Sequence, residues 1–203
     1  MQQQILEFLP ARKGHFLLES GHHGDLWLDL ESLCLNPGRA KMLAAELAAP
    51  LSKLAVDAVC GPLVEGAFIG LMVALQLNVQ FMYSERFARS WEGGLFPVGY
   101  RIPAALRPAL QGKRVALIND VINAGSAIQG TFTDLQSCGA EVVDISALLV
   151  LGGAASAFAA RVGVPLRSLA AMPNNLWIST ECPLCAAGVP LQDVAGFAAP
   201  VEA

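Results

Sequence analysis

The stretch from Val115 to Ala127 places polar and small side chains directly after a short apolar run. The apolar run predicts a buried strand that delivers Asn119 and Asp120 to its carboxyl end. Small residues follow from Asn123 onward and lead into a predicted helix, whose free backbone N–H groups form a cradle for an anion. Asp120 beside that cradle can accept hydrogen bonds from sugar hydroxyls. The stretch therefore predicts a sugar-phosphate site.

Other motifs that bind phosphate or carry out catalysis are incomplete. Gly61 to Gly66 has the glycine spacing of a Walker A loop, but Ala67 and Phe68 stand where Lys and Ser or Thr are required. The glycine-rich fingerprint of dinucleotide-binding enzymes and the nucleophile elbow of α/β-hydrolases do not occur. These absences argue against both enzyme classes.

Five cysteines at scattered spacings make a poor disulfide framework and fit a reducing compartment. Only Cys182 and Cys185 have the two-residue gap that lets two thiolates meet one metal. No second pair follows in sequence, so a zinc site completed by another subunit and a plain structural turn both stay open. A redox pair is less favoured, because no strand leads directly into the motif.

Composition predicts a single globular unit. The 203 residues are 54% hydrophobic and 15% charged, and 13 Lys and Arg against 17 Asp and Glu leave no basic face for nucleic acid. An uncharged run over residues 66–84 is long enough to span a bilayer, but polar residues in its second half favour a buried helix followed by a buried strand. No signal peptide is visible, so we expect a cytoplasmic protein with no membrane partner.

The elements that must position Asp120 alternate along the chain. This alternation predicts an α/β fold with a parallel sheet. The expected strands are 55–60, 79–83, 114–118, 141–151 and an edge strand at 166–170, and the expected helices are 38–54, 67–77 and 126–137. Before them lie a short helix at 3–11 and two strands at 15–20 and 26–30. Residues 84–107 look like a loop, which suggests either a functional segment or a small hairpin.

Four segments together resemble type I phosphoribosyltransferases. Residues 115–127 look like the motif that binds phosphoribosyl pyrophosphate (PRPP), and the Gly-Pro turn at 61–62 is similar to the pyrophosphate loop. Ser20 to His23 resembles the segment near the base. The tail from Glu181 to Leu191 is similar to that of one bacterial branch of orotate phosphoribosyltransferases. The resemblance covers nearly the whole chain and is closest to the orotate enzymes.

The resemblance implies a fold and a reaction. The fold is a central parallel sheet flanked by helices, in one domain over 1–203, with a small hood from about residues 1–35 and the C-terminal segment. The reaction transfers the phosphoribosyl group of PRPP to orotate and releases pyrophosphate, in a homodimer. Mg²⁺ binds with PRPP and keeps its waters, so no full protein metal cage is expected.

The resemblance also implies site residues. Asp120, Asn119 and Arg86 are the catalytic candidates. The 5′-phosphate would lie on Asn123, Ala124, Gly125, Ser126 and Ala127. Pyrophosphate would contact Leu63, Val64, Glu65, Gly66 and Arg89. His22 and His23 are the candidates for contact with the base.

The chain departs from the family pattern at four places. Asn119 stands at a position that is usually acidic, and Glu65 stands where Gly or Lys is usual. No lysine occurs between Lys53 and Lys113, and the strand ending at 151 is followed by glycines where an orotate-binding arginine is usual. Two alternatives therefore stay open beside the orotate enzyme: a non-catalytic PRPP-binding regulator and a phosphoribosyltransferase for another base.

Overall fold

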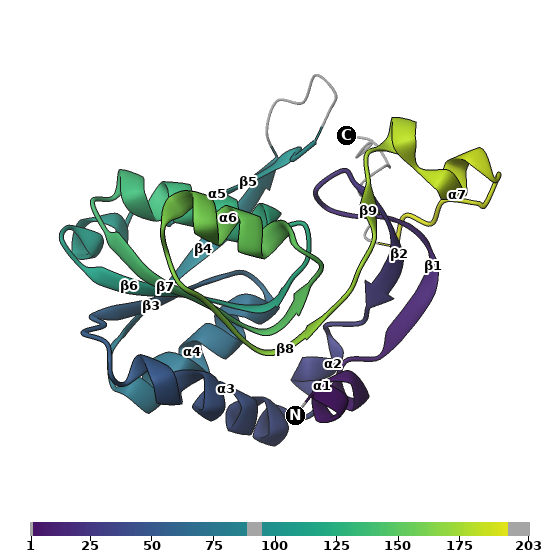
Figure 1. Ribbon diagram of the computed structural model, residues 1–203. Helices are drawn as coiled ribbons and strands as arrows, with labels where there is room; N and C mark the ends of the chain where they lie inside the picture. The colour runs from purple at the N-terminus through teal and green to yellow at the C-terminus, as the bar shows by residue number, and fades with distance from the viewer. Residues whose placement is uncertain (1, 89–94, 195–203) are drawn as a thin grey trace.

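A computed structural model describes residues 2–88 and 95–194, and these residues build two sheets with helices around the larger one (Figure 1). The strands are β1 Ala11–Leu17, β2 His23–Leu28, β3 Ala58–Pro62, β4 Gln80–Ala88, β5 Val98–Arg101, β6 Arg114–Ile122, β7 Glu141–Leu151, β8 Leu166–Met172 and β9 Leu176–Trp177. The α-helices are α1 Gln2–Phe8, α2 Ser32–Leu35, α3 Pro37–Leu51, α4 Glu65–Leu77, α5 Ser126–Ser137, α6 Ala154–Val162 and α7 Pro183–Ala186. Two short 3-10 helices cover Arg107–Leu110 and Ser179–Glu181.

The larger sheet has the strand order β5-β4-β3-β6-β7-β8. All neighbouring pairs are parallel except β4 and β5, which pair antiparallel from Glu85–Arg101 to Ala88–Val98. The predicted parallel α/β sheet is therefore confirmed, with one antiparallel edge strand added. That edge arises because β4 continues to Ala88 and turns back into β5, so the predicted loop over 84–107 contains the small hairpin.

Apolar cores cover both faces of this sheet. Helices α3 and α4 pack on one face and α5 and α6 on the other, as Figure 1 shows. The strands between them are buried on both faces, which is why they read as continuous apolar runs. The uncharged run 66–84 divides between α4 and β4, and none of the helices among the described residues is long and apolar enough to cross a membrane.

Strand β6 is longer than the sequence predicted. It continues to Ile122, so Asn119 and Asp120 lie inside the strand and not beyond its end. The extension is held by pairing with β7, in which Asn119 lies opposite Ala147 and Ile122 opposite Val150. The polar pair is consequently fixed by a sheet ladder, which holds it more rigidly than a loop would.

The smaller sheet joins the two ends of the described chain. Strands β1 and β2 form an antiparallel hairpin, and the short β9 pairs with β2 through His23 and Trp177. Backbone bonds from Gln192 N to His15 O (2.8 Å) and from Leu17 N to Gln192 O (3.0 Å) attach a further C-terminal segment to β1. This sheet lies beside the carboxyl edge of the larger sheet (Figure 1).

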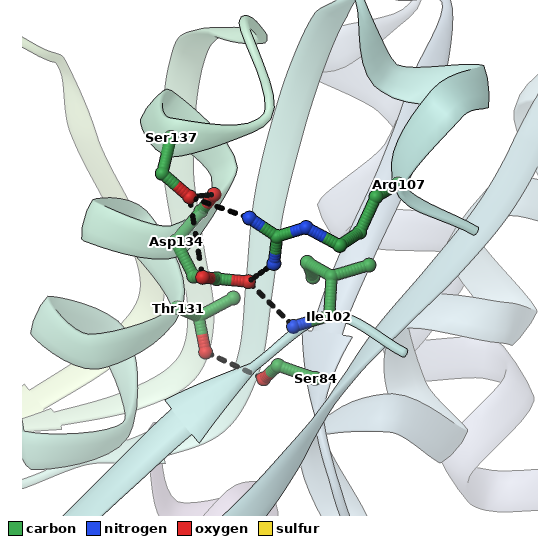
Figure 2. A network of polar contacts seen from close by, with 6 residues as sticks. All are labelled: Ser84, Ile102, Arg107, Thr131, Asp134 and Ser137. Atoms are coloured by element: carbon green, nitrogen blue, oxygen red, sulfur yellow. Dashed lines mark hydrogen bonds and ion pairs between the residues drawn. The ribbon is translucent and has the colours of Figure 1, made fainter. Parts of the chain in front are cut away.

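A polar network fixes α5 against the hairpin of β4 and β5 (Figure 2). Asp134 Oδ2 accepts hydrogen bonds from the Ile102 backbone N–H (2.6 Å) and from Arg107 (2.7 Å), and Arg107 also donates to Ser137 Oγ (2.9 Å). The hydroxyls of Ser84 and Thr131 are fully buried and lie 2.6 Å apart. Because α5 begins at the predicted phosphate cradle, these contacts set the orientation of the cradle.

Candidate active site

A cavity of about 850 Å³ lies between the carboxyl edge of the larger sheet and the smaller sheet. A volume of this size fits a nucleotide-sized ligand. Most of the site residues predicted from the sequence line it: Leu63, Val64, Glu65, Gly66, Arg86, Asn119, Asp120, Asn123, Ala124, Gly125, Ser126 and Ala127. The structure thus brings together three segments that are separated by about 20 to 40 residues in the sequence.

The predicted phosphate cradle is the start of α5. Gly125 precedes this helix with φ of 82°, a left-handed conformation that favours glycine. The backbone N–H groups of the first helical turn have no intrahelical acceptor, and the positive end of the helix dipole favours an anion there. Asn123 does not stand free, because its Oδ1 accepts a hydrogen bond from Asn174 Nδ2 at 2.6 Å. Asn174 is a supporting residue that the sequence analysis did not single out.

Asp120 is almost completely buried, with 4% of its surface exposed. Its Oδ2 atom has no hydrogen-bond partner within the protein. Burial and, less strongly, the nearby carboxylate of Glu65 together raise the pKa of Asp120 to about 7, although the Val121 backbone N–H opposes the shift. A buried carboxylate oxygen without a donor is costly unless a ligand supplies one. The side chain is therefore arranged to accept a hydrogen bond from a ligand in the cavity.

Asn119 is engaged with the backbone. Its Nδ2 donates to the Val121 carbonyl at 2.8 Å, and its Oδ1 lies so close to Gly66 that a Cβ at that position would clash with it. The amide therefore packs the β6 strand against the start of α4. An aspartate could not make the bond to Val121, because a carboxylate has no N–H to donate.

The predicted pyrophosphate loop connects β3 to α4. The Leu63 backbone N–H bonds to the Ser84 carbonyl (2.9 Å), and Glu65 is the first residue of α4. A carboxylate at a helix N-terminus is stabilised by the helix dipole. Glu65 therefore has a structural reason to be there, although its charge faces the same cavity as Asp120.

Glu19 connects the two walls of the cavity, and the sequence did not single it out. Its Oε1 accepts hydrogen bonds from Tyr100 Oη (2.7 Å) and Ser126 Oγ (3.0 Å), and its Oε2 lies 3.3 Å from Arg86 Nη1. Burial and the Glu19 carboxylate raise the pKa of Tyr100, so this hydroxyl stays protonated and donates. These three partners are 67 to 107 positions away in the sequence, so no local pattern could have revealed the contact.

Neither predicted base-contact histidine lines the cavity. The ring of His22 accepts or donates a hydrogen bond with Ser20 (3.0 Å) and packs edge-on against Phe96. His23 is buried at the start of β2, and its Nδ1 faces His15 and Cys185. The His23 ring therefore faces the two other side chains and does not line the cavity, and its contact with a base stays a prediction. Arg89 lies outside the described residues.

The cavity is predominantly acidic. Among the described residues that line it, the only cation is Arg86, which is paired with Glu19. The carboxylates that face it are those of Glu19, Glu31, Glu65, Glu85 and Asp120. An anionic ligand in such a cavity needs cations that accompany it.

Comparison with known proteins places this cavity in a family. No protein-family model matches the chain. The orotate phosphoribosyltransferase of Thermotoga maritima is 30% identical to it over 193 residues, which make up 95% of this chain and 96% of the relative. The chain belongs to the orotate phosphoribosyltransferase family.

Two further members of the orotate phosphoribosyltransferase family show how far the likeness extends. The enzyme of Caldanaerobacter subterraneus subsp. tengcongensis is 29% identical over 191 residues, which cover 93% of this chain and 92% of the relative. The crystal structure of the orotate phosphoribosyltransferase from Aeropyrum pernix matches with a TM-score of 0.62 at 26% identity and covers 85% of this chain and 94% of that chain. The predicted type I phosphoribosyltransferase fold is confirmed.

The sequence singled out the contiguous segment from Asn119 to Ala127, but not the residues that contact it from elsewhere in the chain. Asn174 and Glu19 both contact the cradle, at Asn123 and Ser126 respectively. The only signal for Glu19 was its position just before the Ser-Gly turn at 20–21. That position predicts proximity to a loop and does not predict its partners.

Proposed function

We propose that this chain transfers the phosphoribosyl group of PRPP to orotate and releases pyrophosphate, a step of pyrimidine nucleotide biosynthesis. Membership of the orotate phosphoribosyltransferase family supports the reaction. The observation that carries the proposal is the pairing of a buried carboxylate oxygen without a partner, on Asp120, with the helix start at Ser126 on the same cavity wall. A ribose 5-phosphate needs both kinds of group: hydroxyl acceptors at one end and an anion cradle at the other.

The residues present fit a hard divalent cation such as Mg²⁺. Carboxylate oxygens are its preferred protein ligands, and Glu65 and Asp120 both face the cavity. We infer that these two side chains hold Mg²⁺ together with PRPP, directly or through its waters. When bound, Mg²⁺ supplies the positive charge that neutralises the pyrophosphate oxygens. Without such cations the carboxylates of this cavity would repel a polyanionic substrate.

The protein groups act mainly by positioning and by charge. The backbone N–H groups from Asn123 to Ala127 bind the 5′-phosphate, and Asp120 accepts hydrogen bonds from the ribose hydroxyls. The Asp120 carboxylate also lies close to where positive charge develops on the ribose as its bond to pyrophosphate breaks. Arg86, 51% exposed at the cavity wall, is placed to exchange Glu19 for a pyrophosphate oxygen.

The deciding experiment measures pyrophosphate release from PRPP and Mg²⁺ with and without orotate. We expect release that depends on orotate. In Asp120→Ala, PRPP binding should weaken by about 1–3 kcal/mol, because buried hydrogen bonds to a ligand are lost. Glu46→Gln removes an exposed carboxylate on α3 that does not line the cavity, and it should behave like the wild type. Wild-type affinity in a folded Asp120→Ala variant would refute the role of this residue.

The acidic lining favours a second candidate function. No described lining residue other than Arg86 offers a cation to the carboxylate of orotate. A chain that binds PRPP without turnover, or that uses an uncharged base, would need no such cation. Isothermal titration with PRPP and Mg²⁺, followed by turnover assays with orotate, uracil and adenine, separates three outcomes: an orotate enzyme, an enzyme for an uncharged base, and a protein that only binds PRPP. Binding without turnover would identify a PRPP-binding regulator.

We also infer a homodimer that forms in a reducing compartment such as the cytoplasm. Helix α4 leaves Phe68, Leu71 and Leu75 exposed at helical spacing, and Leu75 is 72% exposed. A second copy of the chain on this face would bury the stripe. The five cysteines are all free thiols, which supports the compartment. Light scattering after gel filtration should give a dimer mass, and Leu75→Glu should shift it toward the monomer.

A further inference from the structure

Four potential metal ligands meet in the smaller sheet, outside the cavity. His15 lies in β1, His23 begins β2, and Cys182 and Cys185 flank the start of α7. Their ligand atoms all lie within 4.8 Å of one another. His15, His23 and Cys182 are buried, with exposed fractions of 1%, 6% and 3%. The two cysteines form the C-x₂-C pair of the sequence, and the two histidines supply the third and fourth ligands that a tetrahedral metal site needs.

The distances between the ligand atoms match a tetrahedral zinc site. His15 Nε2 lies 3.0 Å from His23 Nδ1 and 3.3 Å from Cys182 Sγ. Cys185 Sγ lies 3.3 Å from His23 Nδ1 and 3.7 Å from His15 Nε2. Zinc–nitrogen and zinc–sulfur bond lengths give tetrahedral edges of about 3.4 Å between nitrogens and about 3.6 Å between nitrogen and sulfur. These four distances therefore lie within about 0.4 Å of the edges that one zinc ion imposes, and the remaining two pairs of ligand atoms lie within 4.8 Å.

The protonation of His15 also suits a metal ligand. Its Nδ1 lies 2.8 Å from the Val189 carbonyl, which can only accept, so Nδ1 carries the proton. In the neutral ring the lone pair is then on Nε2, the atom that faces the other three ligands. Metal-bound histidines commonly donate their second ring nitrogen to a backbone carbonyl in this way, which fixes the tautomer and the ring orientation.

The cluster joins segments that are far apart in the sequence. His15 is separated from Cys182 by 167 positions, and His23 from Cys185 by 162. The secondary structure around the cluster is short: β9 has only two residues, and α7 has four. A metal that closes so long a loop stabilises the folded sheet, because the unfolded chain does not present a preformed site.

We propose that His15, His23, Cys182 and Cys185 bind one Zn²⁺ in a structural site that fastens the C-terminal segment to the β1–β2 hairpin. Four protein ligands leave no open position for a substrate, so the site is structural and takes no part in the transfer reaction. It acts on the cavity indirectly, because β2 also contributes Leu26, Trp27 and Leu28 to the cavity wall. The proposal stands whether or not the chain transfers phosphoribosyl groups to orotate.

The test measures metal in the full chain, purified without a histidine tag and under reducing conditions. Mass spectrometry of the elements should find about one zinc per chain, the stoichiometry of a four-ligand structural site. Cys185→Ser should lose most of this zinc. Because Cys185 is exposed, the substitution leaves the core intact. Cys34→Ser is the matched control, since Cys34 is also exposed but lies in α2 outside the cluster, and it should keep its zinc.

A second measurement keeps the proposal testable if Cys185→Ser fails to fold. Zinc in the wild-type chain is removed with a chelator and Co²⁺ is added alone. We expect the visible bands of tetrahedral cobalt and a thiolate charge-transfer band, and a melting temperature that falls on chelation and recovers with Zn²⁺. Absence of both zinc and a cobalt spectrum in the reduced chain would overturn the site. Full zinc content in a folded Cys185→Ser, or a Cys182–Cys185 disulfide trapped by thiol blocking in fresh lysate, would overturn it as well.

Discussion

The two walls of the cavity are held in place by different means. The wall formed by β6 and the start of α5 lies on strands that are buried on both faces and paired along their length. The opposite wall, formed by β2 and Glu19, belongs to a three-stranded sheet that closes through short strands and a few polar contacts. Apolar packing and a long strand ladder fix the first wall. In the second wall Leu26 and Leu28 also pack in an apolar core, but Glu19 is held by polar contacts with distant segments.

This difference decides which wall can be predicted from neighbouring residues in the sequence. On the β6 wall the candidate site residues follow one another from Asn119 to Ala127, and the apolar strand before them predicts their position at the edge of the sheet. On the β2 wall Glu19 contacts Arg86 and Ser126, which are 67 and 107 positions away in the sequence. A substitution in the first wall should therefore lower the free energy of unfolding strongly. A substitution in the second wall should have a smaller effect on stability and should act on the contacts near it.

The largest expected effect is on the β6 wall. Leu117→Ala removes a side chain with 0% exposure from the core between β6 and α5. It should lower the free energy of unfolding by about 2–5 kcal/mol, because buried leucines leave a cavity when truncated. Urea denaturation measures the loss. Leu35→Ala, at a residue that is 86% exposed, should change stability by less than about 0.5 kcal/mol.

Asn119→Asp tests whether the unusual amide in the PRPP motif is structural. The substitution restores the residue type usual in the family but replaces the N–H that bonds Val121 O with a second acceptor. We expect a loss of about 1–3 kcal/mol in the free energy of unfolding, since the partly buried hydrogen bond between the Asn119 side chain and the Val121 carbonyl is lost. Asn123→Asp is the control, because Asn123 uses its oxygen as an acceptor and an aspartate keeps that bond. Equal losses in the two variants would contradict this explanation.

The sequence predicted the parallel strands of the larger sheet because each has a local signal, whereas the antiparallel edge strand β5 was not predicted. Asn36 and Pro37 indicated the start of α3, and the structure shows the Asn36 side chain accepting from the Arg39 N–H. The strands at β7 and β8 were visible as apolar runs. The end of β6 was missed by four residues, because Asn119 and Asp120 are poor strand formers and only pairing with β7 keeps them extended.

The parts of the site that consist of consecutive residues were predictable, and those that join distant segments were not. The cradle from Asn123 to Ala127 depends on Gly125 and on the helix start that follows it, and both are recognisable from consecutive residues in the sequence. The His15 and His23 side chains come together with the C-x₂-C pair only after the chain ends have paired, so sequence spacing predicted an incomplete metal site. The histidines were expected to contact the base because Ser20 to His23 resembles the family segment near the base, whereas in the structure His23 faces Cys185 and does not line the cavity.

The affinity for PRPP should depend on pH through Asp120. In the free protein the pKa of Asp120 is about 7, far above the value of about 4 for an unfolded aspartate. Hydroxyl donors and a cation favour the carboxylate, so binding releases a proton and affinity rises as pH increases toward 7, then levels off. Asp120→Asn should lack this rise. Titration calorimetry from pH 5.5 to about 8.5 measures the PRPP affinity of the wild type and of Asp120→Asn on both sides of the pKa. The ratio of these two affinities cancels the effect of the ionisation of PRPP itself. A constant ratio would refute the shifted pKa.

The smallest expected effect is on the β2 wall, at Glu19. In Glu19→Gln the amide oxygen still accepts from Tyr100 and Ser126, and only the ion pair with the half-exposed Arg86 is lost. The free energy of unfolding should therefore fall by no more than about 1 kcal/mol. The affinity for PRPP should rise by about fivefold, because a negative charge beside the phosphate cradle is removed and Arg86 is freed from it. A drop in affinity would mean that Glu19 orients Ser126 for the phosphate and that the two walls act as one unit. Unchanged affinity would mean that solvent already screens the Glu19 charge from the cradle.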